Sequence, residues 1–402
     1  MKRIYILLVQ EHFASNEQML FLVGSRQVGK TTIAKLVAKE YLEHVYLNWD
    51  TIKDRTLILQ GQTFIEEILP LNKLRKEKPL VIFDEIHKFK SWKNYLKGFY
   101  DLYKGKYHIL VTGSSRLDVY QAGGDSLMGR YFLQRIHPLS GRELEEISVS
   151  LNEIGASLEI NTEKFRNLYE MGGFPEPFLK ASKNFTYKWH SLREKQLLYE
   201  DIRNLSNIHE ISQLEILAEL LKEQTGQLLN RTSLSKKIQV SVPTISKWIS
   251  VLEKFFYCFI VKPWSTNISR SIIKEPKIYL VDWSLIKDEG RRFENFIASH
   301  LLKALNCWSD RGLGKYELYF IRNKDGKEVD FLIARNDIPW FLVEAKLSDN
   351  NRISNNLRYF QEQTGATHAF QVVYSMEYIQ DDCFKYPDPI IVPAITFLSQ
   401  LV

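Results

Sequence analysis

The sequence predicts a protein of the α/β class, and three observations support this. A continuous apolar run at residues 19–23 leads into a glycine-rich loop, and apolar side chains at helical spacing follow the loop. Two short helical patterns separated by a turn occupy residues 232–252. In the last third, a helical pattern and three strand patterns carry acidic side chains in a fixed order. Each of these stretches is a candidate for a separate part of the fold.

Length and composition bound the number of domains and the compartment. At about 150 residues per domain, a chain of 402 residues has room for two or three domains, and its 45% of apolar residues are enough to build them. No uncharged apolar run reaches the length of about 18 residues that a membrane span needs. Residues 2–9 are too short for a signal peptide and lack a small-residue cleavage site. We therefore expect a cytoplasmic protein with no membrane partner.

Cysteine usage and net charge add weaker constraints. The three cysteines, Cys258, Cys307 and Cys383, are isolated and odd in number, which argues against a disulfide framework and a structural zinc site. A formal net charge of +6 is compatible with nucleic acid as a partner, but it is modest for this length and does not decide the matter.

The glycine-rich loop fits the pattern G-x-x-x-x-G-K-[ST] from Gly24 to Thr31 without a mismatch. Gly24 and Gly29 allow the close backbone approach through which N–H groups and a helix N-terminus surround phosphate oxygens. Lys30 is expected to reach the β- and γ-phosphates, and the Thr31 hydroxyl to bind Mg²⁺. The alternative is an ordinary glycine turn before a helix. The expected cofactors are ATP and Mg²⁺, and the expected contacts to the nucleotide are Gly24, Ser25, Arg26, Gln27, Val28, Gly29, Lys30, Thr31 and Thr32.

An acidic pair follows the next buried strand patterns. Residues 44–50 predict a second strand and residues 79–83 a third, and the third runs directly into Asp84 and Glu85. Asp84 is the expected metal ligand, and Glu85 is expected to polarise the attacking water. Although two acids after an apolar strand are common by chance, the preceding phosphate loop favours a catalytic role. The sequence thus indicates a Mg²⁺-dependent ATPase.

Three polar residues beyond the fourth strand pattern are further candidates. The strand at residues 108–112 ends near Thr112 and Ser114, whose hydroxyls are placed to sense the γ-phosphate, although a turn or a helix N-cap explains them equally well. Arg130 is a candidate to stabilise charge on the transferred phosphoryl group, either within its own chain or across the interface of a homo-oligomer. The alternative for Arg130 is a surface salt bridge.

Four motifs together resemble a known family. They are Gly24–Thr32, the Phe83-Asp-Glu-Ile-His-Lys88 block, Val111-Thr-Gly-Ser-Ser115 and Gly172-Gly-Phe-Pro-Glu-Pro177. Nearly end to end, the chain is similar to prokaryotic AAA-type ATPases fused to a C-terminal domain of unknown function. The resemblance implies a restriction-endonuclease-like fold for that C-terminal domain. One departure is a short N-terminal segment, where members of the family often carry a longer helical lead-in that includes an arginine.

The middle of the chain reads as helical. Residues 162–227 predict a lid or connector, interrupted where the Gly172–Pro177 motif breaks the helix. Two helices at residues 232–238 and 241–252, with Ser241 as a cap and a wing strand at residues 257–261, predict a winged helix. Thr244, Ser246 and Lys247 lie near the start of its second helix, where DNA is met, although many winged helices bind only protein.

The last third has the spacing of metal-dependent nucleases with the restriction-endonuclease fold. Two strands around a turn place Asp330 on the second strand, and a further strand carries Glu344 and Lys346 on one face. Asp330 and Glu344 are the expected metal ligands, with help from Glu294 on the preceding helix, while Lys346 orients water. A charged sheet edge is the alternative, since Glu-x-Lys is frequent.

These expectations combine into one architecture. The predicted domains are an AAA-type P-loop ATPase domain at residues 1–150, a helical linker at 151–228, a winged-helix-like segment at 229–265 and a restriction-endonuclease-like domain at 266–402. The predicted function is an ATPase whose nucleotide state is coupled to a DNA-directed, nuclease-like module. The alternative is a non-enzymatic ATP-dependent switch, or a DNA- or protein-binding module with a degenerate nuclease fold. The sequence does not decide whether the module cleaves nucleic acid.

Overall fold

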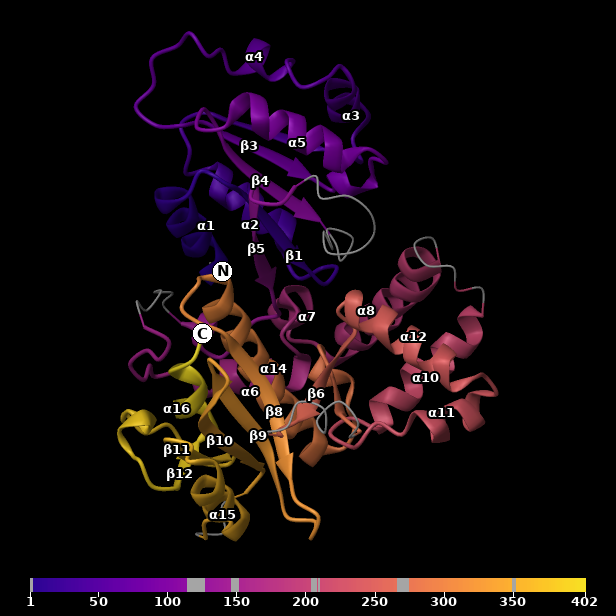
Figure 1. Cartoon of the computed structure of the whole chain (residues 1–402), viewed down its shortest axis with the longest axis vertical. Helices are drawn as coiled ribbons and strands as arrows, with labels where there is room; N and C mark the ends of the chain where they lie inside the picture. The colour runs from indigo at the N-terminus through magenta and orange to yellow at the C-terminus, as the bar shows by residue number, and fades with distance from the viewer. Residues whose placement is uncertain are drawn as a thin grey trace. The chain divides into compact units, whose positions relative to one another are not determined.

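The computed structural model describes residues 3–113, 127–145, 152–203, 208, 210–265, 275–348 and 352–402. Within them the chain forms two compact units. The first ends at His137, and the second takes up the chain at Pro138 and continues to Val402. The boundary between the two units therefore lies before residue 150, the predicted end of the first domain. Residues 138–145 pack with the second unit. Figure 1 traces the chain from the N-terminus in indigo to the C-terminus in yellow.

A five-stranded parallel sheet forms the centre of the first unit. Its strands stand in the order β2-β3-β4-β1-β5, and the strands expected from the sequence are present as β1 to β4. Because all strands run the same way, their carboxyl ends meet at one edge, where ligands of such sheets bind. The elements are α1 (Ile4–Ser15), β1 (Met19–Gly24), α2 (Lys30–Ala38), β2 (His44–Asn48), α3 (Ile52–Leu59), α4 (Ile65–Ile68), β3 (Leu80–Asp84), α5 (Trp92–Tyr103), β4 (His108–Gly113) and β5 (Tyr131–Ile136).

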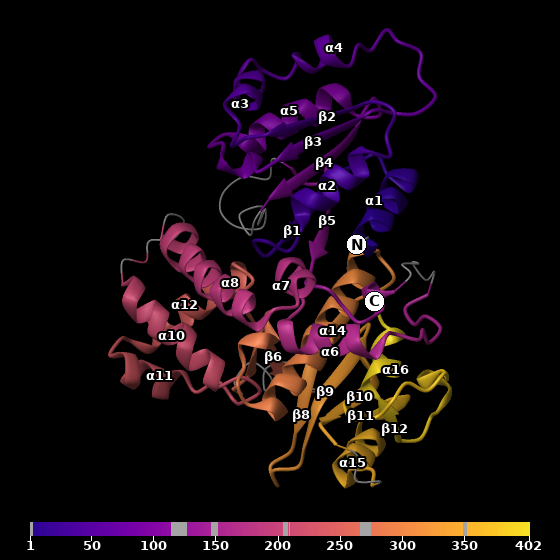
Figure 2. The ribbon, with the colours of Figure 1, turned by 180° about the vertical axis from the view of Figure 1, so that it is seen from behind.

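Helices cover both faces of this sheet. Figures 1 and 2 show α5 on one face and α1 with α2 on the other. On the α5 face, the ring of Phe83 meets that of Phe99 edge-on with centroids 5.0 Å apart. Every residue of β1 is buried, which explains why its sequence is continuously apolar instead of alternating.

The second unit contains a helical part and a second sheet. Its helices are α6 (Thr162–Met171), α7 (Pro175–Lys180), α8 (Lys183–Lys195), the π-helical η4 (Gln196–Ile202), α10 (Ile211–Glu223), α11 (Arg231–Ile238), α12 (Val242–Lys254), α14 (Glu289–Asp310), α15 (Asn355–Thr364) and α16 (Ala394–Ser399), with a 3-10 turn η5 (Trp283–Leu285). Its strands are β6 (Cys258–Pro263), β7 (Lys277–Leu280), β8 (Tyr316–Arg322), β9 (Glu328–Arg335), β10 (Ile338–Lys346), β11 (His368–Val373) and β12 (Ile390–Pro393).

The seven strands of the second sheet follow the order β12-β11-β10-β9-β8-β6-β7. The expected wing strand at residues 257–261 lies largely in β6, which pairs with β7 and also, through Lys262 and Pro263, in parallel with β8. The strand predicted as a wing is thus also a member of the seven-stranded sheet. The pairing with β8 joins segments far apart in the sequence, and no local pattern reveals it.

Two helices pack on opposite faces of the second sheet (Figure 1). The helix predicted around residues 291–302 is longer than expected, because Asp288 caps its first turn by accepting from the Arg291 N–H at 2.9 Å. On the other face, Leu357 and Phe360 of α15 join a buried cluster with Leu332 and Leu342. Between these layers, β9 and β10 carry the acidic residues singled out in the sequence.

The helical middle also follows the expected outline. Asn230 caps α11 and Ser241 caps α12, each accepting a backbone N–H three residues on. Cys258, Cys307 and Cys383 are free and buried. Among the helices that the structure describes, none has the length and apolar character to cross a membrane.

Candidate functional site

The loop between β1 and α2 has the backbone that a phosphate cradle needs. Gly29 has φ +101°, in the left-handed region that favours glycine. A Cβ at Gly24 would lie 2.3 Å from the carbonyl oxygen of Ile136, which pairs with it on β5. Glycine is therefore required at Gly24 for β1 and β5 to pair beside the loop.

Lys30 is the first residue of α2 and is buried in the loop. Its Nζ donates to the carbonyl oxygens of Gly24 at 2.9 Å and Ser25 at 2.7 Å. The ammonium is thus held over the loop by neutral acceptors, which phosphate oxygens can replace with stronger, charge-assisted bonds. The other expected nucleotide contacts, Ser25, Arg26, Gln27, Val28, Thr31 and Thr32, lie in the same loop or the first turn of α2.

Asp84 ends β3 and is only 1% exposed. Its Oδ2 accepts from the Thr31 hydroxyl at 2.9 Å and also from the Tyr46 hydroxyl, while Oδ1 accepts from Thr112. Asn48 and Thr112 pair with Asp84 on the neighbouring strands, so the sheet itself delivers these side chains. Burial and the Asp84 carboxylate raise the pKa of Tyr46, which keeps that phenol protonated as a donor.

The expected Mg²⁺ ligands of the first unit fit a hard cation. Thr31 and Asp84 provide a hydroxyl and a carboxylate that already touch each other, and oxygen donors are what Mg²⁺ prefers. The structure thus brings both predicted ligands together at the carboxyl edge of the sheet.

Glu85 follows Asp84 with φ +58° and lies partly buried. Burial raises the pKa of Glu85, while the Lys88 ammonium, 3.3 Å from its Oε2, opposes this rise. Lys88 in turn bonds Asp50, the acid at the end of the second predicted strand, at 2.5 Å. A carboxylate with a raised pKa beside the phosphate loop has the character of a general base.

Arg130 lies at the amino ends of the strands, away from the phosphate loop at their carboxyl ends. It directly precedes β5, where Met19 pairs with Tyr131, whereas the phosphate loop follows the Gly24–Ile136 pair at the opposite end. Its guanidinium bonds Asp101 at 2.8 Å on the surface. A role at the loop of its own chain is therefore wrong, and a contact to a neighbouring copy stays a prediction. Ser114 lies outside the described residues.

The second unit brings together the residues predicted in its last third. Asp330 on β9 and Glu344 on β10 lie on adjacent strands, where Phe331 pairs with Val343. The Ala345 N–H donates to Asp330 Oδ2 at 2.9 Å, and Lys346 Nζ lies 2.8 Å from Glu344 Oε1. Burial and the nearby Glu294 carboxylate raise the pKa of Asp330.

A buried lysine lies among these acids. Lys277 on β7 is 3% exposed, and its Nζ lies 3.2 Å from Glu294 Oε1 and 2.6 Å from Glu328 Oε1. The Tyr279 hydroxyl donates to the same Glu294 oxygen at 2.6 Å. Although burial disfavours its charged form, the carboxylates of Glu294, Asp330 and Glu328 raise the pKa of Lys277. An internal ammonium therefore offsets part of the negative charge of this cluster.

Two of the predicted metal ligands of the second unit contact lysine or tyrosine side chains in this structure. Glu294 is engaged by Lys277 and Tyr279, and Glu344 by Lys346. Over the described ranges, no three His, Cys, Asp or Glu side chains come together as a metal site would require. That Glu294, Asp330 and Glu344 share a metal stays a prediction, and the Lys277 ammonium places one positive charge beside them.

Three family models match consecutive parts of the chain. Residues 16–145 match a family described as an AAA domain, residues 162–288 a domain of unknown function (DUF8612) and residues 289–388 a domain of unknown function (DUF4143). The first unit is thus similar to an AAA-type, ATPase-like domain. Together with the loop geometry, this match supports ATP binding.

Two similar proteins are described only as uncharacterized. The chain is 23% identical over 356 residues to an uncharacterized protein of Mycobacterium tuberculosis, a match that covers 85% of this chain and 73% of that protein. It is 22% identical over 377 residues to an uncharacterized protein of Haemophilus influenzae, with 87% and 88% covered.

Solved structures resemble the chain only weakly. AMPPCP-bound DnaA from Aquifex aeolicus aligns with a TM-score of 0.32 and 15% identity over 63% of this chain and 88% of that chain. PCH-2 of C. elegans aligns with a TM-score of 0.25 and 16% identity over 62% and 64%.

Several site residues escape the sequence patterns. Arg3, just before α1, donates to the carbonyl oxygens of Val28 in the loop at 2.9 Å and His137 at 2.7 Å, so the short lead-in does contribute an arginine. Tyr46 and Lys277 belong to strands distant in sequence from the residues they contact. A local signal for Lys277 is its place at the start of a short, otherwise apolar strand. Its side chain lies on the same face of that strand as Tyr279, two residues on.

Proposed function

We propose that this protein binds and hydrolyses ATP at the loop between β1 and α2, and that the nucleotide state governs a DNA-directed second unit. The observation that carries the first part is the contact between Thr31 and Asp84, with Lys30 and Glu85 beside them. These four side chains are the parts that phosphoryl transfer to water requires.

Each residue has a distinct task in this mechanism. The backbone N–H groups of the loop and the N-terminus of α2 bind the phosphates, and Lys30 exchanges its carbonyl partners for β- and γ-phosphate oxygens. Thr31 and Asp84 would hold Mg²⁺, which offsets phosphate charge when bound. Glu85 orients the attacking water and accepts its proton at the carboxylate.

The decisive experiment is ATP turnover by Lys30→Ala beside the native protein. We expect the variant to lose turnover to background, because the β- and γ-phosphates lose their cationic partner. Lys39→Ala is the matched control, since Lys39 is an exposed lysine at the end of the same helix. Equal turnover by native protein and Lys30→Ala would overturn the proposal.

Chain continuity supports coupling between the units. Ile136 pairs with Gly24 beside the loop, and His137 accepts from Arg3. The next residue, Pro138, opens the second unit, where its carbonyl oxygen accepts from the buried Lys303 at 3.0 Å. A displacement of the phosphate loop would therefore pass along the main chain of His137 and Pro138 to the buried side chain of Lys303.

We further propose a winged helix in the middle of the second unit. The order α10, a bridge from Leu228 to Lys277, α11, α12 and the β6–β7 hairpin supports it. Exposed Lys247 lies early in α12, where a recognition helix meets DNA. A salt-dependent mobility shift of duplex DNA that Lys247→Ala weakens is the expected result.

For the last third we propose a restriction-endonuclease-like fold whose cluster is degenerate. Supporting this is the placement of Lys277 among Glu294, Asp330 and Glu328. Nuclease assays on the native protein and on Asp330→Ala test it. Cleavage by the native protein that Asp330→Ala abolishes would favour a working nuclease instead.

A further inference from the structure

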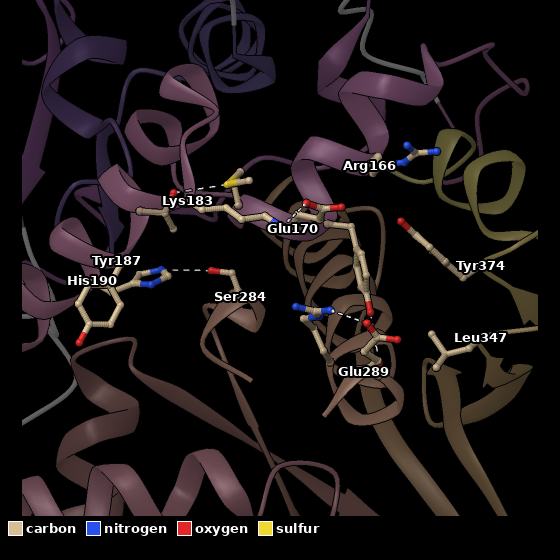
Figure 3. A pocket seen from close by; sticks show the side chains of 13 residues that line it. Arg166, Glu170, Lys183, Tyr187, His190, Ser284, Glu289, Leu347 and Tyr374 are labelled. Atoms are coloured by element: carbon tan, nitrogen blue, oxygen red, sulfur yellow. Dashed lines mark hydrogen bonds and ion pairs between the residues drawn. The ribbon is translucent and has the colours of Figure 1, made fainter. Parts of the chain in front are cut away.

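A cavity of about 760 Å³ opens within the second unit (Figure 3). Side chains of α6, α8, the 3-10 turn η5 and the first turn of α14 form its walls, together with residues that follow β10 and β11. Neither the phosphate loop nor the acidic cluster of the second unit contributes to this lining. The residues that line it are Arg166, Tyr169, Glu170, Met171, Lys183, Thr186, Tyr187, His190, Ser284, Glu289, Arg292, Leu347 and Tyr374.

The lining has more cations than anions. Arg166, Lys183 and Arg292 face two carboxylates, and the pairs Lys183–Glu170 and Arg292–Glu289 are each 3.6 Å long. Lys183 and Glu289 are largely exposed, so these pairs are weak and open to competition from a ligand. Within the described ranges, Arg166 forms no ion pair. The cavity therefore favours an anion.

Arg292 is already positioned for such a ligand. Its guanidinium lies over the ring of Tyr169, 4.9 Å from the centroid, which fixes the plane of the group. Its Nε is buried and has no hydrogen-bond partner in the part of the chain that the structure describes. A buried donor without an acceptor is unfavourable, so a ligand oxygen that reaches it is favoured. The planar, multidentate guanidinium suits phosphate oxygens.

Polar side chains that include His190 and Ser284 line another part of the cavity (Figure 3). Ser284 Oγ donates to the buried Asp282 at 2.5 Å and lies 3.2 Å from His190 Nε2. Gly172 has φ +86°, and a Cβ there would lie 2.6 Å from Ser284 Oγ. ATP binding does not explain the Gly172–Pro177 motif. Its first glycine lets the backbone pack directly against Ser284 in this wall of the cavity.

An aromatic side chain stands beside the same part of the cavity. Tyr187 is 78% exposed, and it makes no contact with another aromatic ring among the residues described. A free aromatic face beside a positively charged pocket is the arrangement on which nucleic-acid bases stack. The cavity volume lies in the range of about 300–1,000 Å³ typical of small-molecule sites and is far larger than one phosphate needs.

We propose that this cavity binds a nucleotide unit, with its phosphate between Arg166 and Arg292 and its base toward Tyr187 and His190. The unit comes from one of two sources, a free nucleotide or the 5′-phosphorylated end of a single strand. This site is independent of ATP hydrolysis at the loop, and its test does not depend on that activity.

Fluorescence anisotropy and calorimetry on the full chain separate the two sources. The probes are thymidine monophosphate and a labelled 5′-phosphorylated oligothymidine of four nucleotides, with the unphosphorylated oligomer for comparison. We expect one of the two phosphorylated probes to bind and at least a tenfold loss of affinity in Arg166→Gln and in Arg292→Gln. Monophosphate binding alone identifies a free nucleotide, whereas oligomer binding that requires the 5′-phosphate identifies a strand end.

Control variants exclude unrelated effects. Arg358→Gln removes an exposed arginine of α15 outside the cavity, and Lys30→Ala removes the loop lysine. Both should retain probe affinity within twofold. Arg166 is exposed, so its variant reports on binding even where Arg292→Gln lowers the melting temperature. Failure of the native protein to bind either phosphorylated probe, or equal loss in Arg358→Gln, would overturn the proposal.

Discussion

At the scale of single residues, Glu85 has the environment of a base that is tuned by burial. Lys88 and the backbone bond to Thr112 hold the side chain beside Asp84, in a turn with φ +58°. Because burial raises the pKa of Glu85, the active carboxylate form is lost at a higher pH than for an ordinary glutamate, whose pKa is about 4.3.

We predict that Glu85→Gln lowers ATP turnover about 100-fold or more while ATP still binds, because the amide cannot accept a proton from water. In the native protein, turnover should fall on the acid side at a pH above 4.3, the ordinary glutamate value. Steady-state rates and ATP affinity from pH 4.5 to 9 test both statements. An unchanged rate in Glu85→Gln would assign the base elsewhere.

Lys277 is a buried lysine among carboxylates, and its replacement tests whether its charge stabilises the second unit. Lys277→Met leaves Glu294, Glu328 and Asp330 without their buried cation, and breaking such a pair costs about 3–5 kcal/mol. We expect the loss of unfolding free energy to be largest near pH 8 and smaller near pH 5. The sign follows because burial and the nearby Glu294 carboxylate raise the pKa of Asp330, so this carboxyl group takes up a proton as the pH falls.

A divalent ion distinguishes this account from a simple packing defect. In Lys277→Met, Mn²⁺ should raise the melting temperature, because the cluster gains a replacement cation, whereas the native protein should respond far less. Lys324→Met, at an exposed lysine in the β8–β9 turn, is the matched control. Equal Mn²⁺ stabilisation of native protein and Lys277→Met would show that Lys277 does not occupy the cation position.

At the scale of elements, α14 holds residues 138–145 through one buried ion pair. Lys303 contacts the Glu143 carboxylate and also donates to Ser140 Oγ at 2.9 Å, and both charged side chains are almost fully buried. His300 on the same helix accepts from the Gly141 N–H at 3.1 Å, and burial lowers the pKa of His300 to about 3, so the ring stays neutral.

We predict that Lys303→Met destabilises the second unit by about 3–5 kcal/mol, because it leaves Glu143 charged and buried. The double variant Lys303→Met with Glu143→Leu should regain at least half of that loss, since no uncompensated charge remains. Urea unfolding of the single and double variants measures this difference. Strict additivity of the two substitutions would mean that the pair does not interact.

Whether the sequence predicts an element or a site residue depends on whether the contacts that define it lie close together in the chain. The phosphate loop, β3 with Asp84 and the β8–β9 hairpin are predictable, because consecutive residues carry their signals. Arg3, Tyr46 and Lys277 reach their sites only through strand order and helix packing, which no short pattern contains. β6 shows the same limit, because its wing-like sequence does not reveal the pairing with β8.

At the scale of the whole molecule, the proposed coupling would run through the residues around His137, where the chain passes from the first unit to the second. Arg3 bridges the loop carbonyl of Val28 and that of His137, so movement of the loop displaces the end of the first unit. Pro138 follows directly and is bound by Lys303. This link consists of hydrogen bonds and two residues of main chain, and we therefore expect a displacement of the loop to reach residues 138–145.

We predict that a non-hydrolysable ATP analogue with Mg²⁺ changes amide hydrogen exchange in residues 138–145 as well as in residues 24–31. Arg3→Gln should keep the change in the loop but reduce the change in residues 138–145 at least twofold, because the bridge between Val28 and His137 is lost. Exchange in α15, which packs on the other face of the second sheet, serves as the internal reference. Changes confined to the loop in the native protein would show that nucleotide binding does not reach the second unit by this route.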